Sequence, residues 1–197
     1  VLFARFKKTQ IPWVQADDFP ISGQIATLSG TDLAAKRQQW LRRHDQDTGG
    51  IMGFFPLIAE LPVLFTTTLD KARKIFKFTR GTIRAWTLDP VDEVHVRSSN
   101  DKDIILEKPP LMIYVEKAGE NMPQHLDLDP QIYGVSCRSV DWQIAPQSEN
   151  WIKRFGFPMV PDFATTVHGA AGDQLETAIG ELGSFAQTPS QEDALKG

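Results

Sequence analysis

The sequence predicts an α/β protein with a small β-barrel or rolled sheet in its middle part. Three observations carry this prediction: a helical pattern over residues 31–44, a series of short apolar runs over residues 58–115, and a run over residues 158–182 that indicates a strand, a tight turn and a further element. Helical and extended patterns that share one chain favour the α/β class, and many short strands at regular spacing are typical of small barrels.

The helix over residues 31–44 begins with a capping signal. Thr31 or Asp32 can accept hydrogen bonds from the first free backbone N–H groups. Its larger side chains fall broadly on one side, as Leu33, Trp40, Leu41 and His44 do. Before it, residues 11–13 predict an extended segment, because the residue before a proline avoids the helical region, and residues 17–20 predict a turn.

The central series consists of short runs separated by turn residues. We expect strands over residues 63–68, 76–78, 82–88, 91–96, 104–106 and 111–115. Asp89-Pro90 and Pro109-Pro110 predict turns between them. Residues 133–140 predict a strand that returns to the sheet.

Basic side chains gather in this central region. No acidic residue stands among them, and they are Lys71, Arg73, Lys74, Lys77, Arg80 and Arg84. Phe76, Phe78 and Trp86 are interleaved with them. Basic side chains beside aromatic rings can follow a phosphate backbone and stack on bases, which is how many proteins bind a single strand. The other interpretation is a charged sheet edge that prevents aggregation while the aromatic rings face the core.

A second candidate site lies in the stretch that starts at Pro158. Thr165, Thr166 and His168 precede a turn of small residues that includes Gly169 and Gly172. Hydroxyls, an imidazole and exposed backbone N–H groups can together bind a phosphate, because the N–H groups converge on an anion. The same stretch is also compatible with a tight turn that has no ligand.

Composition limits the other function classes. The chain has 197 residues and a net charge of −4, so any nucleic-acid role depends on a local basic patch. A single cysteine, Cys137, excludes an internal disulfide and is expected to be a small buried side chain. The four histidines lack the spacing of a zinc site. No apolar run reaches the length of a membrane span.

The late motif resembles one found in superfamily 1 DNA helicases of the PIF/RecD-like group, including those of Helitron-type mobile elements. The order is Phe163-Ala-x-Thr-x-His168-x-x-x-Gly172-x-x-Leu175, entered through Pro158-x-x-Pro161 and closed by Ile179-x-x-Leu182. Ala171 and Gln174 stand where the family typically has Gln and Thr.

A second stretch resembles the same group. Glu60-Leu-Pro-Val-Leu-Phe-Thr-Thr-Thr68 and Phe78-Thr-Arg-Gly-Thr-Ile-Arg-Ala-Trp86 are similar to the segment that enters a small SH3-like β-barrel insertion in the second RecA-like domain. The resemblance implies that residues 1–57 belong to the RecA-like core, residues 58–140 to the insertion, and residues 141–197 to the returning core. Neither end looks like a natural terminus, so we expect a piece of a longer protein.

The resemblance implies the C-terminal region of an ATP-dependent DNA helicase that contacts single-stranded DNA. Thr166 would donate a hydroxyl to a phosphate, His168 would couple that contact to the nucleotide cleft, and Gly172 would allow close approach. Phosphoryl transfer needs a phosphate loop, an acidic pair and an arginine, and none is identified here. ATP and Mg are therefore expected only in the full-length protein, and the fragment alone is not expected to be active.

Two alternatives stay open at this point. Because Ala171 replaces the family's Gln, the chain can instead be a catalytically dead remnant that acts as a single-strand nucleic-acid-binding or protein-interaction module. A purely structural domain without a ligand is the other. Nuclear residence would suit such a helicase, although the sequence shows no targeting signal.

Overall fold

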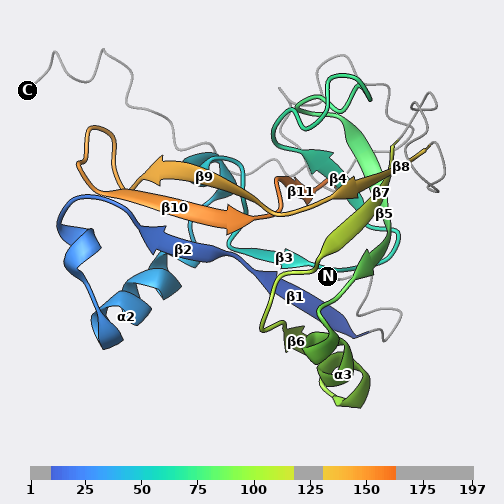
Figure 1. The fold of residues 1–197 in the computed structure, drawn as a ribbon, viewed down its shortest axis with the longest axis horizontal. Helices are drawn as coiled ribbons and strands as arrows, with labels where there is room; N and C mark the ends of the chain where they lie inside the picture. The colour runs from blue at the N-terminus through green and yellow to red at the C-terminus, as the bar shows by residue number, and fades with distance from the viewer. Residues whose placement is uncertain (1–9, 118–130, 163–197) are drawn as a thin grey trace, which may run out of the picture. The chain divides into compact units, whose positions relative to one another are not determined.

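The structure is a computed structural model that describes residues 10–117 and 131–162. Within these ranges, short strands form three sheets with few helices between them (Figure 1). The sheet around one of these strands, β1 (Ile11–Gln15), is mixed because it has one parallel pair, and the strand pairs of the other two sheets are antiparallel. No helix of the described residues is long and apolar enough to cross a membrane. The late motif with Thr166, His168 and Gly172 lies outside the described residues.

The largest sheet has five antiparallel strands in the order β11-β4-β5-β7-β8. They are β4 (Pro62–Phe65), β5 (Arg80–Thr87), β7 (Met112–Lys117), β8 (Ile132–Val135) and β11 (Met159–Pro161). Val63, Ile83 and Val115 are fully buried and alternate with more exposed neighbours. Because successive side chains of a strand point to opposite faces, this alternation buries one face of the sheet.

The second sheet is built around β1 (Ile11–Gln15). It pairs with β3 (Phe54–Pro56) in the antiparallel sense and with β6 (Asp103–Ile105) in the parallel sense. The extended segment predicted at residues 11–13 is therefore confirmed.

The third sheet has the order β2-β10-β9 and contains a buried ion pair. Its strands are β2 (Asp17–Pro20), β9 (Arg138–Gln143) and β10 (Trp151–Gly156). Asp18 lies opposite Arg154 in the register, and both side chains are almost completely buried. Arg154 Nε and Nη2 donate to the two carboxylate oxygens of Asp18 at 2.8 and 2.7 Å.

Two further N–H donors of Arg154 are bound by backbone carbonyl oxygens. Nη1 donates to the carbonyl oxygen of Ile51 at 3.1 Å, and Nη2 also donates to that of Trp40 at 2.7 Å. The guanidinium carbon lies 5.4 Å from the centroid of the Trp142 ring. A buried charge is tolerated when it is paired and hydrogen-bonded, and Arg154 is paired with Asp18 and uses four of its five N–H donors.

Two α-helices are present, together with two short 3-10 helices, η1 (Gln24–Thr27) and η2 (Asp45–Thr48), among the described residues. The first α-helix, α2 (Gly30–Leu41), follows Ser29 and buries Trp40 and Leu41 near its end. The predicted helix is confirmed, although it ends three residues before His44. The predicted cap at Thr31 or Asp32 is wrong, because both residues lie inside the helix and the capping position is Ser29, whose side chain makes no capping hydrogen bond.

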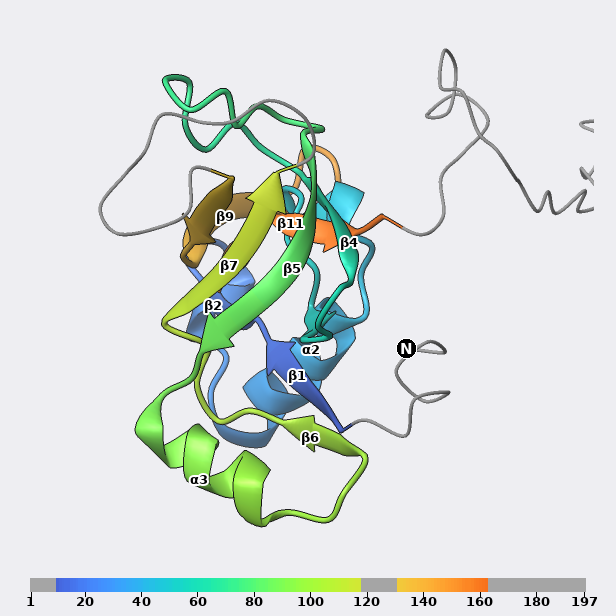
Figure 2. The ribbon, with the colours of Figure 1, turned by 90° about the vertical axis from the view of Figure 1, so that its right-hand side faces the viewer.

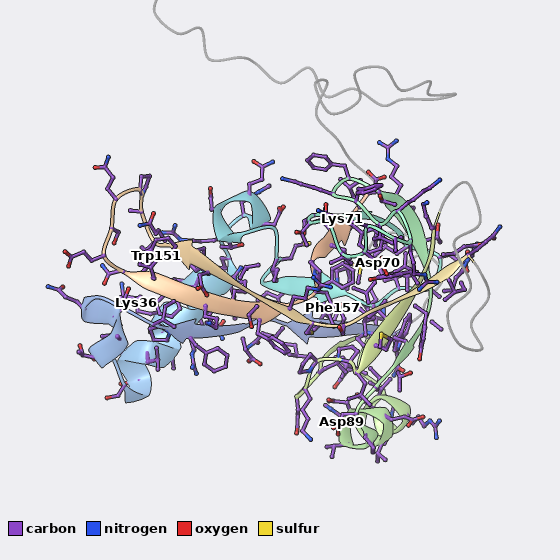
Figure 3. The ribbon with its side chains drawn as sticks, turned by 45° about the horizontal axis from the view of Figure 1, so that its top comes forward. Lys36, Asp70, Lys71, Asp89, Trp151 and Phe157 are labelled. Carbon is purple, nitrogen blue, oxygen red and sulfur yellow. The ribbon has the colours of Figure 1, made fainter. Side chains whose placement is uncertain are left out.

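The second α-helix, α3 (Pro90–Ser98), shows strong local signals at its start. The side chain of Asp89, which Figure 3 shows at this end of the helix, accepts a hydrogen bond from the Val91 N–H at 3.0 Å, and Pro90 occupies the first turn. The buried carboxylate of Asp92 accepts the N–H groups of Glu107 and Lys108 at 2.8 and 3.0 Å. These bonds fasten the helix to the loop after β6.

The principal core joins the five-stranded sheet to the sheet around β1. Phe65, Ile75, Ile113 and Met159 are completely buried, and they belong to this single cluster. The backbone of β5 comes very close to β7 at Gly81. A Cβ at this position would lie 2.5 Å from Val115 Cγ1 and 2.7 Å from the Glu116 carbonyl oxygen, so only glycine fits there without a shift.

Three predicted elements are wrong. Residues 91–96 are helical, because the Asp89-Pro90 pair that suggested only a turn caps and starts α3. Residues 17–20 form β2 instead of a turn, since the charge of Asp18 is satisfied by Arg154. Residues 76–78 form a turn instead of a strand.

The predicted strand over residues 133–140 is two strands. They are β8 and β9, and they belong to different sheets. The RecA-like assignment, the SH3-like barrel and the three domain boundaries stay predictions.

Candidate nucleic-acid interface

The connection between β4 and β5, residues 66–79, carries four of the six predicted basic residues: Lys71, Arg73, Lys74 and Lys77. It lies beyond the ends of these two strands, at the top of Figure 2. Asp70 and Lys71 are marked on it in Figure 3. We call this connection the basic turn.

The first half of the basic turn is a single helical turn closed at both ends. The Asp70 side chain accepts the Arg73 N–H at 3.0 Å, as a capping residue does. Ile75 N donates to Asp70 O at 2.7 Å, and Lys74 N donates to Lys71 O at 3.2 Å. This pair of bonds is that of a Schellman motif, and its left-handed residue is Lys74, with φ of 56°.

The second half is a tight turn over residues 76–79. Thr79 N donates to Phe76 O at 3.1 Å, and Phe76 N donates to Thr79 Oγ1 at 3.0 Å. Of the two central residues only Phe78 has a positive φ, 70°, which is the pattern of a type II turn. Phe78 N also donates to Phe65 O on β4 at 2.7 Å, so the turn is tied to the sheet.

Both left-handed positions usually carry glycine. A side chain in this conformation costs about 1 kcal/mol or more, because Cβ approaches the following carbonyl oxygen. Here the two positions carry Lys74 and Phe78. The fully buried Ile75 anchors the backbone between them.

The basic turn presents its long side chains to solvent. Lys71, Lys74 and Lys77 are exposed, and Phe76 and Phe78 are 46% and 65% exposed. Lys77 Nζ lies 4.9 Å from the centroid of the Phe78 ring. The interpretation as a protected sheet edge with rings in the core is wrong for this segment, because β5 is an interior strand and only Trp86 of the three rings packs on the core.

Arg73 differs from the three lysines because it is buried, with 7% exposure. Its Nη2 donates to the carbonyl oxygen of Ile132 at 3.1 Å, and its guanidinium lies 5.1 Å from the centroid of the Tyr133 ring. Burial, with a smaller contribution from Asp70, raises the pKa of Tyr133. Arg73 therefore anchors the basic turn to β8 through Ile132 and Tyr133.

Arg80 and Arg84 lie on β5 and are paired with carboxylates. Arg80 Nε is 2.8 Å from Asp162 Oδ2. Arg84 forms ion pairs with both Glu60 and Glu116, and these hydrogen bonds, that to Glu60 first, raise the pKa of the guanidinium. Their charges are thus balanced locally, which distinguishes them from the exposed side chains of Lys71 and Lys77.

Neither the single cysteine nor the possible metal ligands among the described residues form a reactive site. Burial, with a contribution from Asp17, raises the pKa of Cys137 to about 12, so its thiol is neutral at pH 7 and a poor nucleophile. In residues 10–117 and 131–162, no three His, Cys, Asp or Glu side chains come together in a way that could bind a metal ion.

A hollow of about 430 Å³ lies between β5 and α3. It is lined by Trp86, Thr87, Leu88, Glu93, Val96 and Arg97. Glu93 and Arg97 form an ion pair with each other, so this hollow offers no unbalanced charge to an ionic ligand.

The predicted site residues thus have three different outcomes. The structure brings three predicted lysines together on one exposed turn, places three predicted arginines in internal contacts, and leaves Thr166, His168 and Gly172 outside the described residues. Phe76 and Phe78, which the sequence placed among the basic residues as possible stacking rings, are both exposed on this turn.

No protein-family model matches the chain. No curated protein matches it either. Among solved structures it is similar to the Pif1 helicase from Candida albicans, at 14% identity and a TM-score of 0.47, over 89% of this chain and 35% of that one. It is also similar to unliganded Pif1 from Bacteroides sp, at 9% identity and a TM-score of 0.40, over 86% and 30% of the two chains.

A further similar structure is that of Pif1 helicases that unwind forked double-stranded DNA, at 10% identity and a TM-score of 0.41. The chain spans about a third of the length of these solved structures. At such low identities the likeness concerns the course of the backbone alone.

Proposed function

We propose that this chain is part of an ATP-dependent DNA helicase of the PIF/RecD-like group and that it contacts single-stranded DNA through the basic turn. The late motif and the segment around β4 and β5 support the family, since both occur in the expected order. The observation that carries the DNA contact is the group of three exposed lysines on one anchored turn.

The direct contacts are assigned to Lys71, Lys74 and Lys77. Arg73 is buried, and Arg80 and Arg84 are ion-paired, so these arginines fix the turn and the strand that follows it. No carboxylate among the described residues pairs with Lys71 or Lys77. Their ammonium groups are therefore available to phosphates, whose binding releases condensed counterions and is sequence-independent.

The nucleotide would be bound elsewhere in the complete protein. The sequence contains no Gly-x-x-x-x-Gly-Lys-Ser/Thr loop, so the residues present do not fit ATP and Mg²⁺. In the same proposal Thr166 donates its hydroxyl to a phosphate, His168 couples this contact to the nucleotide cleft, and Gly172 allows the backbone to approach the strand.

The test is fluorescence anisotropy of a labelled oligothymidylate with the whole chain. Changing Lys71, Lys74 and Lys77 to Gln should weaken binding at low salt by at least about tenfold. The log–log salt dependence of the wild-type chain should have a slope of about −2, and the variant's slope should approach zero.

The control variant removes equal charge elsewhere. Lys36, Arg42 and Lys102 are exposed basic residues outside the basic turn, and their change to Gln should alter affinity by no more than about twofold. Equal losses in the two variants would show that net charge alone attracts the strand. A wild-type chain that does not bind would refute the proposed contact.

A further inference from the structure

We propose that Phe78 is a specificity-determining residue whose ring stacks on an unpaired base, so that the basic turn prefers strands with accessible base faces. This inference rests on the proposed function, because the three lysines bring the strand to the turn. It adds a residue that recognises bases to residues that attract only phosphates.

The backbone at Phe78 favours this role over an incidental one. Its φ of 70° is a conformation that suits glycine, and its ring is 65% exposed. A large apolar side chain that is exposed and has a strained backbone contributes little to the stability of the fold. Strain of this kind concentrates at functional sites, where the surrounding structure enforces it.

The backbone that carries the ring is held in a defined place. Phe78 N donates to Phe65 O at 2.7 Å, and the next residue, Thr79, donates its N–H to Phe76 O at 3.1 Å. The backbone on both sides of the ring is therefore fixed to β4 and to the turn itself. A fixed backbone leaves only the two side-chain torsions of Phe78 to be ordered when the ring stacks on a ligand.

The neighbouring charge indicates a nucleic acid as the partner. Lys77 Nζ lies 4.9 Å from the Phe78 ring centroid, and Lys71 and Lys74 are exposed on the same turn. A base can stack on the ring while its phosphate contacts the ammonium group. Phe76, 46% exposed and two residues earlier, offers a second apolar surface. In a duplex the base faces are already stacked on one another, so this contact selects unpaired strands.

The experiment compares two labelled strands of equal length, an oligothymidylate and an abasic oligonucleotide that keeps the phosphates and lacks the bases. The wild-type chain should bind the oligothymidylate about tenfold more tightly. Phe78→Gly should reduce oligothymidylate affinity to that of the abasic strand, with abasic affinity unchanged. Its Tm should equal or exceed that of the wild type, because glycine relieves the left-handed strain.

Two further variants sharpen the test. Phe78→Trp should keep the preference for bases. Phe19→Ala removes another exposed ring, 47% exposed and 5.6 Å from the Arg37 guanidinium, and should leave both affinities unchanged. If Phe78→Gly keeps the preference, or if the wild-type chain binds both strands equally, the inference is overturned.

The lysine variant separates the two claims. If the change of Lys71, Lys74 and Lys77 to Gln weakens binding of both strands while Phe78→Gly changes nothing, the proposed function stands and only the role of Phe78 fails. If the wild-type chain binds neither strand, both fail.

Discussion

Arg154 and Lys77 each place a positive charge against an aromatic ring, and their surroundings give the two contacts different meanings. The Arg154 guanidinium is fully buried, faces Trp142 at 5.4 Å and is hydrogen-bonded to Asp18 and two carbonyl oxygens. The Lys77 ammonium faces Phe78 at 4.9 Å on an exposed turn. The first contact has all its partners within the fold, while the second leaves capacity for a ligand.

The difference teaches that a cation beside a ring is no functional signal by itself. What distinguishes the two sites is whether the donors already have acceptors and whether the backbone adopts its conformation without cost. Arg154 lies on a regular strand, β10. The basic turn holds Lys74 and Phe78 in left-handed conformations.

The largest expected effect is a loss of stability when the buried Arg154 is replaced. Arg154→Met leaves the Asp18 carboxylate buried without its partner, and this should lower the free energy of unfolding by about 3 to 5 kcal/mol. Urea denaturation followed by tryptophan fluorescence measures the change.

The control for Arg154→Met removes both charges. The double variant Asp18→Leu and Arg154→Met should recover a large part of the lost stability, because a buried pair replaced by apolar side chains is often neutral. A cost below about 1 kcal/mol for Arg154→Met alone would mean that the pair is solvated in solution, since exposed pairs contribute that little.

A smaller change in stability, of opposite sign, is expected when Lys74 of the basic turn is replaced. Lys74→Gly removes a side chain from the left-handed position of the Schellman motif and should raise the free energy of unfolding by up to about 1 kcal/mol. The same variant should bind oligothymidylate more weakly, because one phosphate contact is lost.

Gln147 provides the matched control for Lys74. It also has a positive φ, 63°, and lies outside the basic turn. Gln147→Gly should stabilise the chain to a similar degree and leave binding unchanged. If both glycine variants bind like the wild type, Lys74 makes no contact with the strand.

The smallest expected effect concerns Asp89, whose half-buried carboxylate is fixed by hydrogen bonds. The Val91 N–H, and next the Lys108 ammonium, lower the pKa of this carboxyl group below its ordinary value of 3.8. The ionised group therefore stabilises the fold above that ordinary value, and this stabilisation is lost as pH falls through the lowered pKa. Asp89→Asn keeps a capping acceptor and removes the titration.

The pH test compares urea midpoints of the wild-type chain and the Asp89→Asn variant at pH 7 and near pH 3. The wild type should be the more stable at pH 7, and the difference should shrink on acidification. A difference that is constant with pH would contradict the role given to the Asp89 charge.

Local signals in the sequence predicted local structure well. The helix that became α2 and the extended segment at β1 were readable from their patterns. The strand prediction over residues 91–96 failed because three valines outweighed the Asp89-Pro90 cap, although that cap decides the helix. The run of lysines and arginines could be seen in the sequence. Its position in the connection between β4 and β5 could not be predicted.

Long-range contacts decide which basic residues face solvent, and sequence does not reveal them. Arg80 meets Asp162, and Arg84 meets Glu60 and Glu116. Arg73 reaches the carbonyl of Ile132 on β8. Each partner comes from another strand or loop, so the difference between bound arginines and available lysines appears only in the folded chain.

The separation of Asp18 and Arg154 along the chain bears on the order of folding. The two residues are 136 positions apart, so their pair closes a long loop, and the entropy of closure must be overcome before the pair contributes. The internal bonds of the basic turn join residues that are close in sequence, so they can form early. We therefore expect the ion pair to act after the rate-limiting step, where it slows unfolding and has little influence on the rate of folding.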